Sequence, residues 1–422
     1  MRIKQVRVTP IAFRDPPLLN ASGIHEPYAL RSIIEVESAG GVVGLGETYG
    51  DAATLSVLIR VAEALPGLDA CDLNGLRLRV AAAIDGMDAQ TEAGAELAPG
   101  SHPGKRLANA YSAFEVACLD LQARWLGIPL VMLLGGAVRR EVPFSAYLFF
   151  KYAEHIDTPY PADRWGEALH EEQIVAQARR MVDAHGFGSI KLKAGVFPPQ
   201  HEAACIKALR RAFPRCPLRI DPNASWSLET AARVADMIGS DIEYYEDPVA
   251  GLEDMAALHR RTGIALATNM VVTDSDEFRR NIEVGAVQII LADHHYWGGL
   301  RDTQTLARMC ATFGLGVSMH SNSHLGISLM AMAHVAAAVP HLGHACDTHY
   351  PWQDEDVVAG GKVPIVAGCV RISESPGLGV ELDRERLREL HERFLSIDIR
   401  SRDDARQMRK YDPNWRTTRP RF

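Results

Sequence analysis

Short apolar runs that each lead into a polar residue recur at nearly constant intervals through the second half of the chain. The first leads into Lys191-Leu192-Lys193, and the later ones lead into Asp221, Glu246, Asn269, Asp293, His320 and Asp347. Neighbouring ends lie 23 to 28 residues apart, the length of one strand, one helix and two short connections. The segments before and between them carry apolar residues at helical spacing, as at Ile174, Ala178 and Met181 before the first end and at Ala204, Ala208 and Leu209 after it.

Strand–helix units repeated in this way predict an α/β fold, a (β/α) barrel whose site lies at the carboxyl ends of the strands. An earlier apolar run over residues 142–147 supplies one further strand. Together with the seven runs that begin at Lys191-Leu192-Lys193, it completes the eight strands of a barrel.

The two lysines of the first run alternate with one leucine, so on a strand both side chains point the same way. If Lys191 and Lys193 project into one site, we expect each to lower the pKa of the other, which makes a lysine a usable base. The alternative is a solvent-facing edge strand with both lysines at the surface. The acidic residues that follow at the later strand ends favour the site.

The two ends of the chain flank this barrel. Residues 3–8, 33–36 and 42–47 alternate as strands do, and the stretch after Tyr111 is helical in pattern. The segment after about residue 375 is charged and helical. We predict an N-terminal α+β capping domain over 1–125, completed by 375–422, and a barrel domain over 126–374. Such a cap would cover the barrel mouth and exclude water.

Composition narrows the class of protein. The 422 residues are 47% hydrophobic and 23% charged, as in a globular protein, and the net charge of −8 argues against a nucleic-acid partner. No apolar stretch approaches the roughly 20 residues of a membrane span, and the first residues alternate like a strand rather than a signal peptide. Seven cysteines without a C-x-x-C pair indicate reduced thiols and a cytoplasmic protein.

The order of the polar motifs resembles one family. Lys191-x-Lys193, Asp221-Pro222-Asn223, Glu246-Asp247-Pro248, Asn269, Asp293 and His320 are similar to the enolase superfamily, mandelate racemase-like branch, and within it to the glucarate dehydratases. Residues 18–25, 267–270, 320–324, 346–349 and 402–404 are also similar to segments of that family. The resemblance implies a modified (β/α)7β TIM barrel with an α+β capping domain.

Three of these residues offer oxygen ligands from consecutive strand ends. Asp221, Glu246 and Asn269 together carry two negative charges when both carboxylates are ionised, which suits a hard cation, Mg²⁺. The metal and Lys191 would stabilise the enediolate that forms when a proton α to a carboxylate is removed. Ordinary strand-end caps are the alternative interpretation of the two acids.

The resemblance also implies two opposed bases. Lys193 would act on one side, and His320, paired with Asp293, on the other. The activity implied is a Mg²⁺-dependent dehydratase that removes the C5 proton and the 4-hydroxyl of D-glucarate, or of its epimer L-idarate, to give 5-dehydro-4-deoxy-D-glucarate. A packed core histidine is the alternative for His320.

A diacid needs further contacts at its distal end. The resemblance assigns substrate binding to His25, Tyr147, Asn223, Asn322, His349 and Arg402. Arg402 could hold the second carboxylate in bidentate fashion; a solvated arginine, and a surface histidine at His25, are the alternatives.

Two other functions stay open. One is a dehydratase or epimerase of the same superfamily that acts on another aldarate or sugar acid, such as galactarate, and the other is a non-catalytic paralogue. For partners we expect a small-molecule diacid sugar and a homo-oligomer, with no nucleic acid and no membrane.

Overall fold

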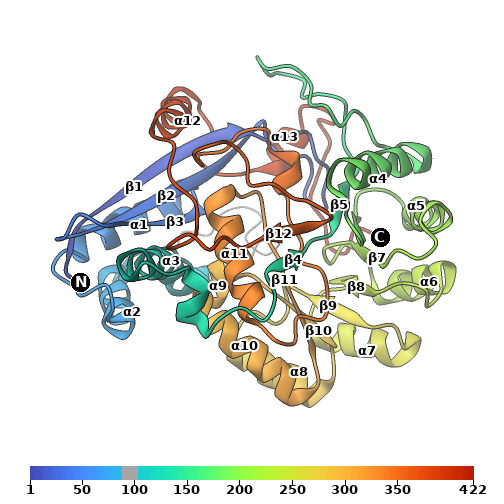
Figure 1. Cartoon of the computed structure of the whole chain (residues 1–422). Helices are drawn as coiled ribbons and strands as arrows, with labels where there is room; N and C mark the ends of the chain where they lie inside the picture. Colours follow the sequence, from blue (N-terminus) through green and yellow to red (C-terminus); the bar gives the residue numbers. More distant parts are fainter. Residues whose placement is uncertain (88–102) are drawn as a thin grey trace.

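The computed structural model describes residues 1–87 and 103–422 and divides into an antiparallel sheet with its helices and a curled parallel sheet (Figure 1). The first sheet has the order β1-β2-β3, with strands β1 (Ile3–Arg14), β2 (Tyr28–Ser38) and β3 (Val43–Tyr49). Its helices are α1 (Ala52–Ala64), α2 (Leu73–Ile84) and α3 (Arg106–Leu126).

Glycines bring α3 very close to this sheet. A Cβ atom on Gly46 of β3 would lie 2.4 Å from the carbonyl oxygen of Ala113, and one on Gly44 would lie 2.0 Å from that of Ala117. Only residues without a side chain allow this approach. As a result α3 packs directly on the strands, and it also contacts α9 and α10 of the barrel.

Seven strands of the described chain form the parallel sheet, in the order β11-β10-β9-β8-β7-β6-β5. They are β5 (Ala146–Phe149), β6 (Ile190–Lys193), β7 (Leu218–Asp221), β8 (Tyr244–Glu246), β9 (Leu266–Thr268), β10 (Ile289–Ala292) and β11 (Gly316–Met319). The helices between and after them are α4 (Glu171–His185), α5 (Pro199–Ala212), α6 (Leu228–Ile238), α7 (Leu252–Thr262), α8 (Ser275–Val284), α9 (His294–Trp297), α10 (Leu300–Phe313) and α11 (Gly326–Ala338). Figure 1 shows most of these helices outside the sheet, as the repeat predicts.

The prediction of a single strand over 142–147 is wrong, because the structure has two strands there. Residues Glu141–Pro143 form β4, which pairs antiparallel with β12 (Cys369–Arg371), and β5 begins only at Ala146. The chain changes partners between them: the amide of Phe144 donates to the carbonyl of Gly368, and that of Ser145 donates to the carbonyl of Cys346.

The regular eighth strand predicted before Asp347 is also wrong. Residues 342–347 do lie between β11 and β5, because the amide of Asp347 donates to Met319 and Ser145 donates to Cys346. Side chains, however, bind the carbonyl groups that a strand ladder would use. The Ser318 hydroxyl lies 3.0 Å from the carbonyl oxygen of Ala345, and Arg219 Nη1 lies 2.8 Å from the same oxygen. An irregular segment therefore closes the barrel.

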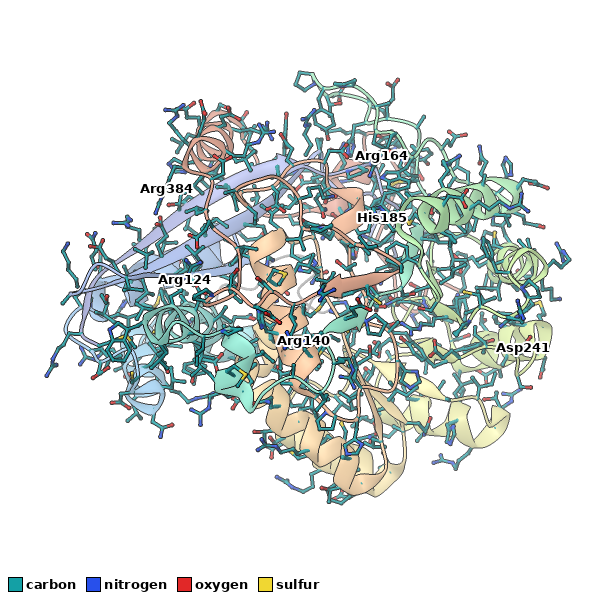
Figure 2. The ribbon with its side chains drawn as sticks, viewed as in Figure 1. Arg124, Arg140, Arg164, His185, Asp241 and Arg384 are labelled. Carbon is teal, nitrogen blue, oxygen red and sulfur yellow. The ribbon has the colours of Figure 1, made fainter. Side chains whose placement is uncertain are left out.

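The C-terminal segment returns to the N-terminal sheet through α12 (Arg384–Ser396) and α13 (Asp404–Met408). Helix α12 packs along β1, and Figure 2 labels Arg384 at its start. Arg384 pairs with Glu35 of β2 at 2.6 Å. Arg124 at the end of α3 similarly pairs with Glu381 at 2.6 Å. Residue 422 ends beside the barrel, where its carbonyl accepts the amide of Ser227. The domain boundaries at 125 and 375 stay a prediction.

Two further observations concern the whole described chain. All seven cysteines lie in the described ranges, and each is unpaired. In those ranges no helix has both the length and the apolar character needed to cross a membrane.

Candidate active site

A cavity of about 270 Å³ lies where the N-terminal sheet meets the carboxyl ends of the barrel strands. Its walls come from the loop after β1, from the strand ends and from the segment before α13. Lys193, Asn269 and His320 line it. All the predicted substrate-binding residues line it as well, namely His25, Tyr147, Asn223, Asn322, His349 and Arg402. The remaining predicted site residues lie directly behind this wall.

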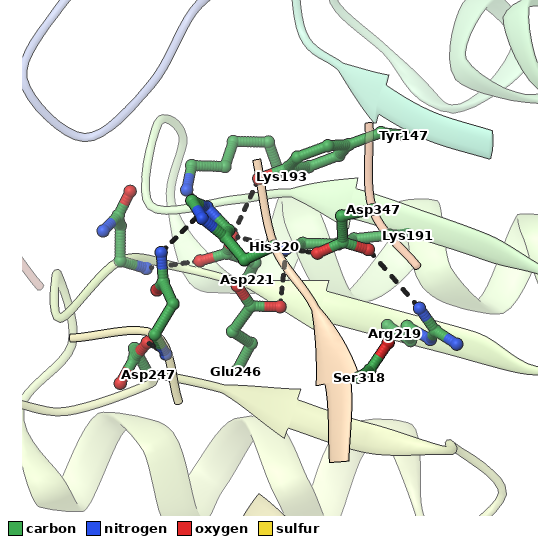
Figure 3. Close-up of polar contacts among 12 residues, drawn as sticks. Tyr147, Lys191, Lys193, Arg219, Asp221, Glu246, Asp247, Ser318, His320 and Asp347 are labelled. Atoms are coloured by element: carbon green, nitrogen blue, oxygen red, sulfur yellow. Dashed lines mark hydrogen bonds and ion pairs between the residues drawn. The ribbon is translucent and has the colours of Figure 1, made fainter. Parts of the chain in front are cut away.

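Lys191 lies at the centre of three buried carboxylates (Figure 3). Its ammonium nitrogen is 2.5 Å from Glu246 Oε2, 2.6 Å from Asp347 Oδ2 and 3.1 Å from Asp221 Oδ2. Burial alone would lower the pKa of Lys191, but the three negative charges raise it well above its usual value. The expectation that the neighbouring lysine lowers this pKa is wrong, and Lys191 is held as a cation.

Lys193 reaches the same carboxylate from the cavity side. Its nitrogen lies 2.8 Å from Asp221 Oδ2, the oxygen that Lys191 also approaches, so both lysines point to one side of the strand as the alternation predicts. The Tyr147 hydroxyl donates to this oxygen as well, at 2.9 Å. Although burial would raise the pKa of Asp221, the two lysines hold it below its usual value. Asp221 is therefore a fixed negative charge.

One of the predicted metal ligands, Glu246, keeps an unsatisfied oxygen atom. Its side chain is fully buried; Oε2 pairs with the Lys191 ammonium, and Oε1 has no hydrogen-bond partner among the described residues. Asn269 places its amide nitrogen 2.8 Å from His320 Nε2, which turns its oxygen away from the histidine. Two buried carboxylates and an amide oxygen fit a hard divalent cation.

His320 and Asp293 form the predicted pair. His320 Nδ1 lies 3.3 Å from Asp293 Oδ2, while the other oxygen of Asp293 lies 2.6 Å from Nδ1 of His295. Burial raises the pKa of Asp293, but the two histidines outweigh it and hold the pKa well below its usual value. An ionised carboxylate on Nδ1 and an amide donor on Nε2 leave His320 as the Nδ1–H tautomer, with its lone pair on Nε2 toward the site.

The distal wall carries cationic and aromatic side chains. Arg402 binds Asp404 through two bonds, Nε at 2.8 Å and Nη2 at 2.7 Å, so one edge of its guanidinium already has a carboxylate partner. His25 lies 3.0 Å from Asp15 and stacks on His349 with ring centroids 6.0 Å apart. Burial holds the pKa of His349 well below its usual value, and its Nδ1 accepts no hydrogen bond from the described residues.

Two acids of this site, Asp347 and Asp247, were not predicted from the sequence to have a role. Asp347 was seen as a strand end but received no role, although it binds Lys191 and lies 3.4 Å from Arg219. Asp247 accepts the Thr268 hydroxyl at 2.5 Å and the amide of Asn269 at 2.9 Å, which fixes Asn269 in place. The Glu-Asp-Pro sequence and the regular interval before Asp347 were the available signals.

A parallel barrel with cationic and acidic side chains at its carboxyl ends, beneath an antiparallel N-terminal sheet, defines an enolase-type protein. Residues 173–386 match the enolase C-terminal domain-like family, and residues 5–135 match the N-terminal domain of the mandelate racemase/muconate lactonizing enzyme family. The chain therefore belongs to the enolase superfamily.

Two relatives match over most of the chain. The chain is 52% identical to a probable glucarate dehydratase of Streptomyces coelicolor, over 99% of this chain and 98% of that one. It is 26% identical to a chloromuconate cycloisomerase of Pseudomonas putida, over 85% of this chain and 90% of that one.

Solved structures agree over the full length. An enolase of Pseudomonas fluorescens with bound magnesium, potassium and tartrate is 68% identical, with a TM-score of 0.98, over 100% of this chain and 99% of that one. An enolase of Thermobispora bispora complexed with magnesium and formate is 50% identical, with a TM-score of 0.96, over 100% of both chains.

Proposed function

We propose that this protein is a magnesium-dependent acid-sugar dehydratase that converts D-glucarate and L-idarate to 5-dehydro-4-deoxy-D-glucarate. The observation that carries the proposal is the position of the two bases. Lys193 enters the cavity beside Asp221, and His320 enters it beside Asn269, so two bases from different strands flank one set of oxygen ligands. Such a site can remove a proton from either configuration of one carbon.

The relatives support the substrate class. The Streptomyces coelicolor relative carries the name probable glucarate dehydratase, and the Pseudomonas fluorescens structure holds magnesium and tartrate. Tartrate is itself a hydroxylated diacid, the chemical class to which glucarate and idarate belong. A cytoplasmic location and a homo-oligomeric assembly stay predictions.

In the proposed reaction, Asp221, Glu246 and the Asn269 amide oxygen would hold the magnesium ion. When bound, this ion supplies a Lewis acid for the substrate carboxylate next to the reacting carbon. Lys191, kept cationic by its carboxylate neighbours, donates to the same carboxylate as negative charge develops.

The two bases divide the substrates between them. His320 takes the C5 proton of D-glucarate on Nε2, while Asp293 holds the tautomer and the imidazolium that results. Lys193 takes the C5 proton of L-idarate. His320 then gives a proton to the departing 4-hydroxyl, which leaves as water, and the enol product becomes the ketone. With D-glucarate this is the proton that His320 took from C5; with L-idarate the C5 proton stays on Lys193, and His320 gives a proton that it already carries. At the distal end, the Nη1–Nη2 edge of Arg402 would receive the second carboxylate, since the Nε side is bound to Asp404.

The test is incubation with Mg²⁺ and each acid sugar in D₂O, followed by NMR of the 2-keto product and of deuterium at C5. We expect turnover of D-glucarate and L-idarate. Lys193→Ala should abolish turnover of L-idarate while Mg²⁺ still binds, and His320→Asn should block dehydration of D-glucarate, because each loses one base. Full activity of either variant on its own substrate would contradict the assignment of that base.

Other outcomes have equally definite meanings. Turnover of a different aldarate such as galactarate, with glucarate inert, would keep the chemistry and change the substrate. Absence of both turnover and exchange with every acid would favour a non-catalytic paralogue.

A further inference from the structure

Asp293, the partner of His320, is held mainly by another histidine. Its Oδ1 atom accepts the backbone amide of His295 at 2.9 Å and lies 2.6 Å from His295 Nδ1. The contact of its other oxygen with His320 is longer, at 3.3 Å. The carboxylate and the His295 ring are both buried, so water does not compete for these bonds. The orientation of Asp293 is therefore fixed from the His295 side.

His295 is fixed in turn by the N-terminal sheet. Its Nε2 atom lies 3.0 Å from Arg31 Nη2 and 3.1 Å from the Ser328 hydroxyl. A guanidinium can only donate, so Nε2 accepts, and the ring hydrogen sits on Nδ1, where it donates to Asp293.

Arg31 is itself anchored within the sheet and to the barrel. Its Nε atom lies 2.9 Å from Glu47 Oε1, on the neighbouring strand β3. Glu47 also accepts the backbone amides of Leu325 at 2.8 Å and Ser328 at 2.9 Å, at the start of α11. The Tyr49 ring lies beside both groups, 4.9 Å from the Arg31 guanidinium carbon and 5.3 Å from the His295 ring.

We propose that His295, supported by Arg31 of the N-terminal sheet, is a positioning residue that orients Asp293 and thereby His320, and so serves one of the two bases selectively. Lys193 draws its partner from a different strand: its nitrogen lies 2.8 Å from Asp221 Oδ2. None of the contacts that the structure describes for Lys193 involves His295 or Arg31. The inference rests on the proposed division of D-glucarate and L-idarate between the bases.

The test compares two variants on both epimers. His295→Phe keeps a ring of similar shape and removes the ring donor to Asp293, so we expect the rate of C5 deuterium exchange on D-glucarate to fall about 10- to 100-fold, the effect of losing a partner that orients a functional histidine. On L-idarate, where Lys193 takes the C5 proton, we expect this exchange rate to stay within about threefold of the wild type. His295→Asn keeps an amide donor near the position of Nδ1 and should recover most of the activity on D-glucarate.

A matched control is His324→Phe. His324 is equally buried, lies 3.3 Å from the Ser328 hydroxyl and belongs to the same polar cluster, but its described contacts do not include Asp293. We expect it to change both epimers by the same factor. Equal losses of C5 exchange on both epimers for His295→Phe would overturn the inference and leave His295 as a packing residue.

A measurement without turnover separates this inference from the proposed function. In protein labelled with ¹⁵N-histidine, the Nδ1 proton of His320 bonded to Asp293 should give a low-field resonance, which His295→Phe should shift or broaden and His324→Phe should preserve. If the wild type turns over neither acid, the proposed function fails, and this resonance alone decides the inference. An unchanged resonance in His295→Phe would overturn it.

Discussion

Asp347 holds Lys191 but is not one of the predicted metal ligands. Asp347→Asn therefore removes a carboxylate beside Lys191 and leaves the metal ligands in place. In the structure Asp347 Oδ2 lies 2.6 Å from the Lys191 ammonium, and Oδ1 lies 3.4 Å from Arg219 Nη1. All three side chains are almost fully buried. Asparagine has nearly the same shape, so the change isolates the loss of charge.

The expected loss of stability follows from these contacts. Breaking a buried ion pair by removing one partner costs about 3–5 kcal/mol. We expect the lower end, about 3 kcal/mol, because Lys191 keeps Asp221 and Glu246 as partners when no metal is bound. With an unfolding entropy near 2.1 cal/mol/K per residue, this corresponds to a fall in Tm of about 3 °C for a chain of this length.

The loss should also weaken magnesium binding. When Asp221 and Glu246 bind a cation, Asp347 is the carboxylate left to hold the Lys191 ammonium. Without Asp347, Lys191 competes with the cation for the same two oxygens, and we expect Kd for Mg²⁺ to rise at least about tenfold, equivalent to about 1.4 kcal/mol.

The assay pairs thermal unfolding in EDTA with calorimetric titration of Mg²⁺. Asp356→Asn is the control, because Asp356 is also buried but accepts the amide of Gly326 rather than a lysine. It should lose stability and keep its magnesium affinity. An Asp347→Asn protein with unchanged Kd would refute the argument that Asp347 holds Lys191 away from the cation.

Two other predictions concern metal and pH. Removing magnesium should lower Tm. Restoring magnesium to 100 times its Kd should stabilise the fold by about 2.7 kcal/mol, which calorimetry would record as a rise in Tm of about 3 °C. NaCl at the same ionic strength should not produce this rise. Burial raises the pKa of Glu202 to about 7, although three backbone amides that donate to it oppose this. The folded protein therefore binds this proton more tightly than the unfolded chain, so the free energy of unfolding should decline by about 3 kcal/mol as pH rises from about 4.5 to about 7. Glu202→Gln should flatten this pH dependence, measured by urea titration at several pH values. An unchanged pH dependence in Glu202→Gln would contradict the shifted pKa.

The sequence was sufficient for the features that depend on periodicity. The alternation Lys191-Leu192-Lys193 placed both lysines on one side of a strand, and both do approach the same oxygen of Asp221. The interval between polar strand ends predicted which acids would share one end of a barrel. These features follow from local backbone geometry, which repeats along the chain.

Features that depend on which distant side chains meet were not predictable in this way. The pKa of Lys191 rises because three carboxylates from other strands surround it, and its sequence neighbour Lys193 does not decide it. The segment before Asp347 is irregular because Ser318 and Arg219 bind its carbonyl groups, which no apolar pattern reveals. The contact between Arg31 and His295 joins residues 264 positions apart.

The same distant contacts make the two halves of the site unequal. Glu47 of β3 accepts the amides of Leu325 and Ser328 at the start of α11, and Glu115 of α3 accepts the amide of Leu300 at the start of α10. Carboxylates at these positions stabilise the unpaired N–H groups of a helix start. The N-terminal unit thus supports the helices that follow β10 and β11, the strands that lead into Asp293 and His320.

The lysine half draws its support from the barrel itself. Glu202 of α5 accepts the amides of Gly195, Val196 and Phe197, in the loop that directly follows Lys193. Lys193 is thus supported by its own strand–helix unit, whereas His320 is supported through the N-terminal sheet. Loosening the contact between that sheet and the barrel should therefore impair the histidine side of the site first, and this asymmetry is the physical reason to expect the two epimers to respond differently to the same perturbation.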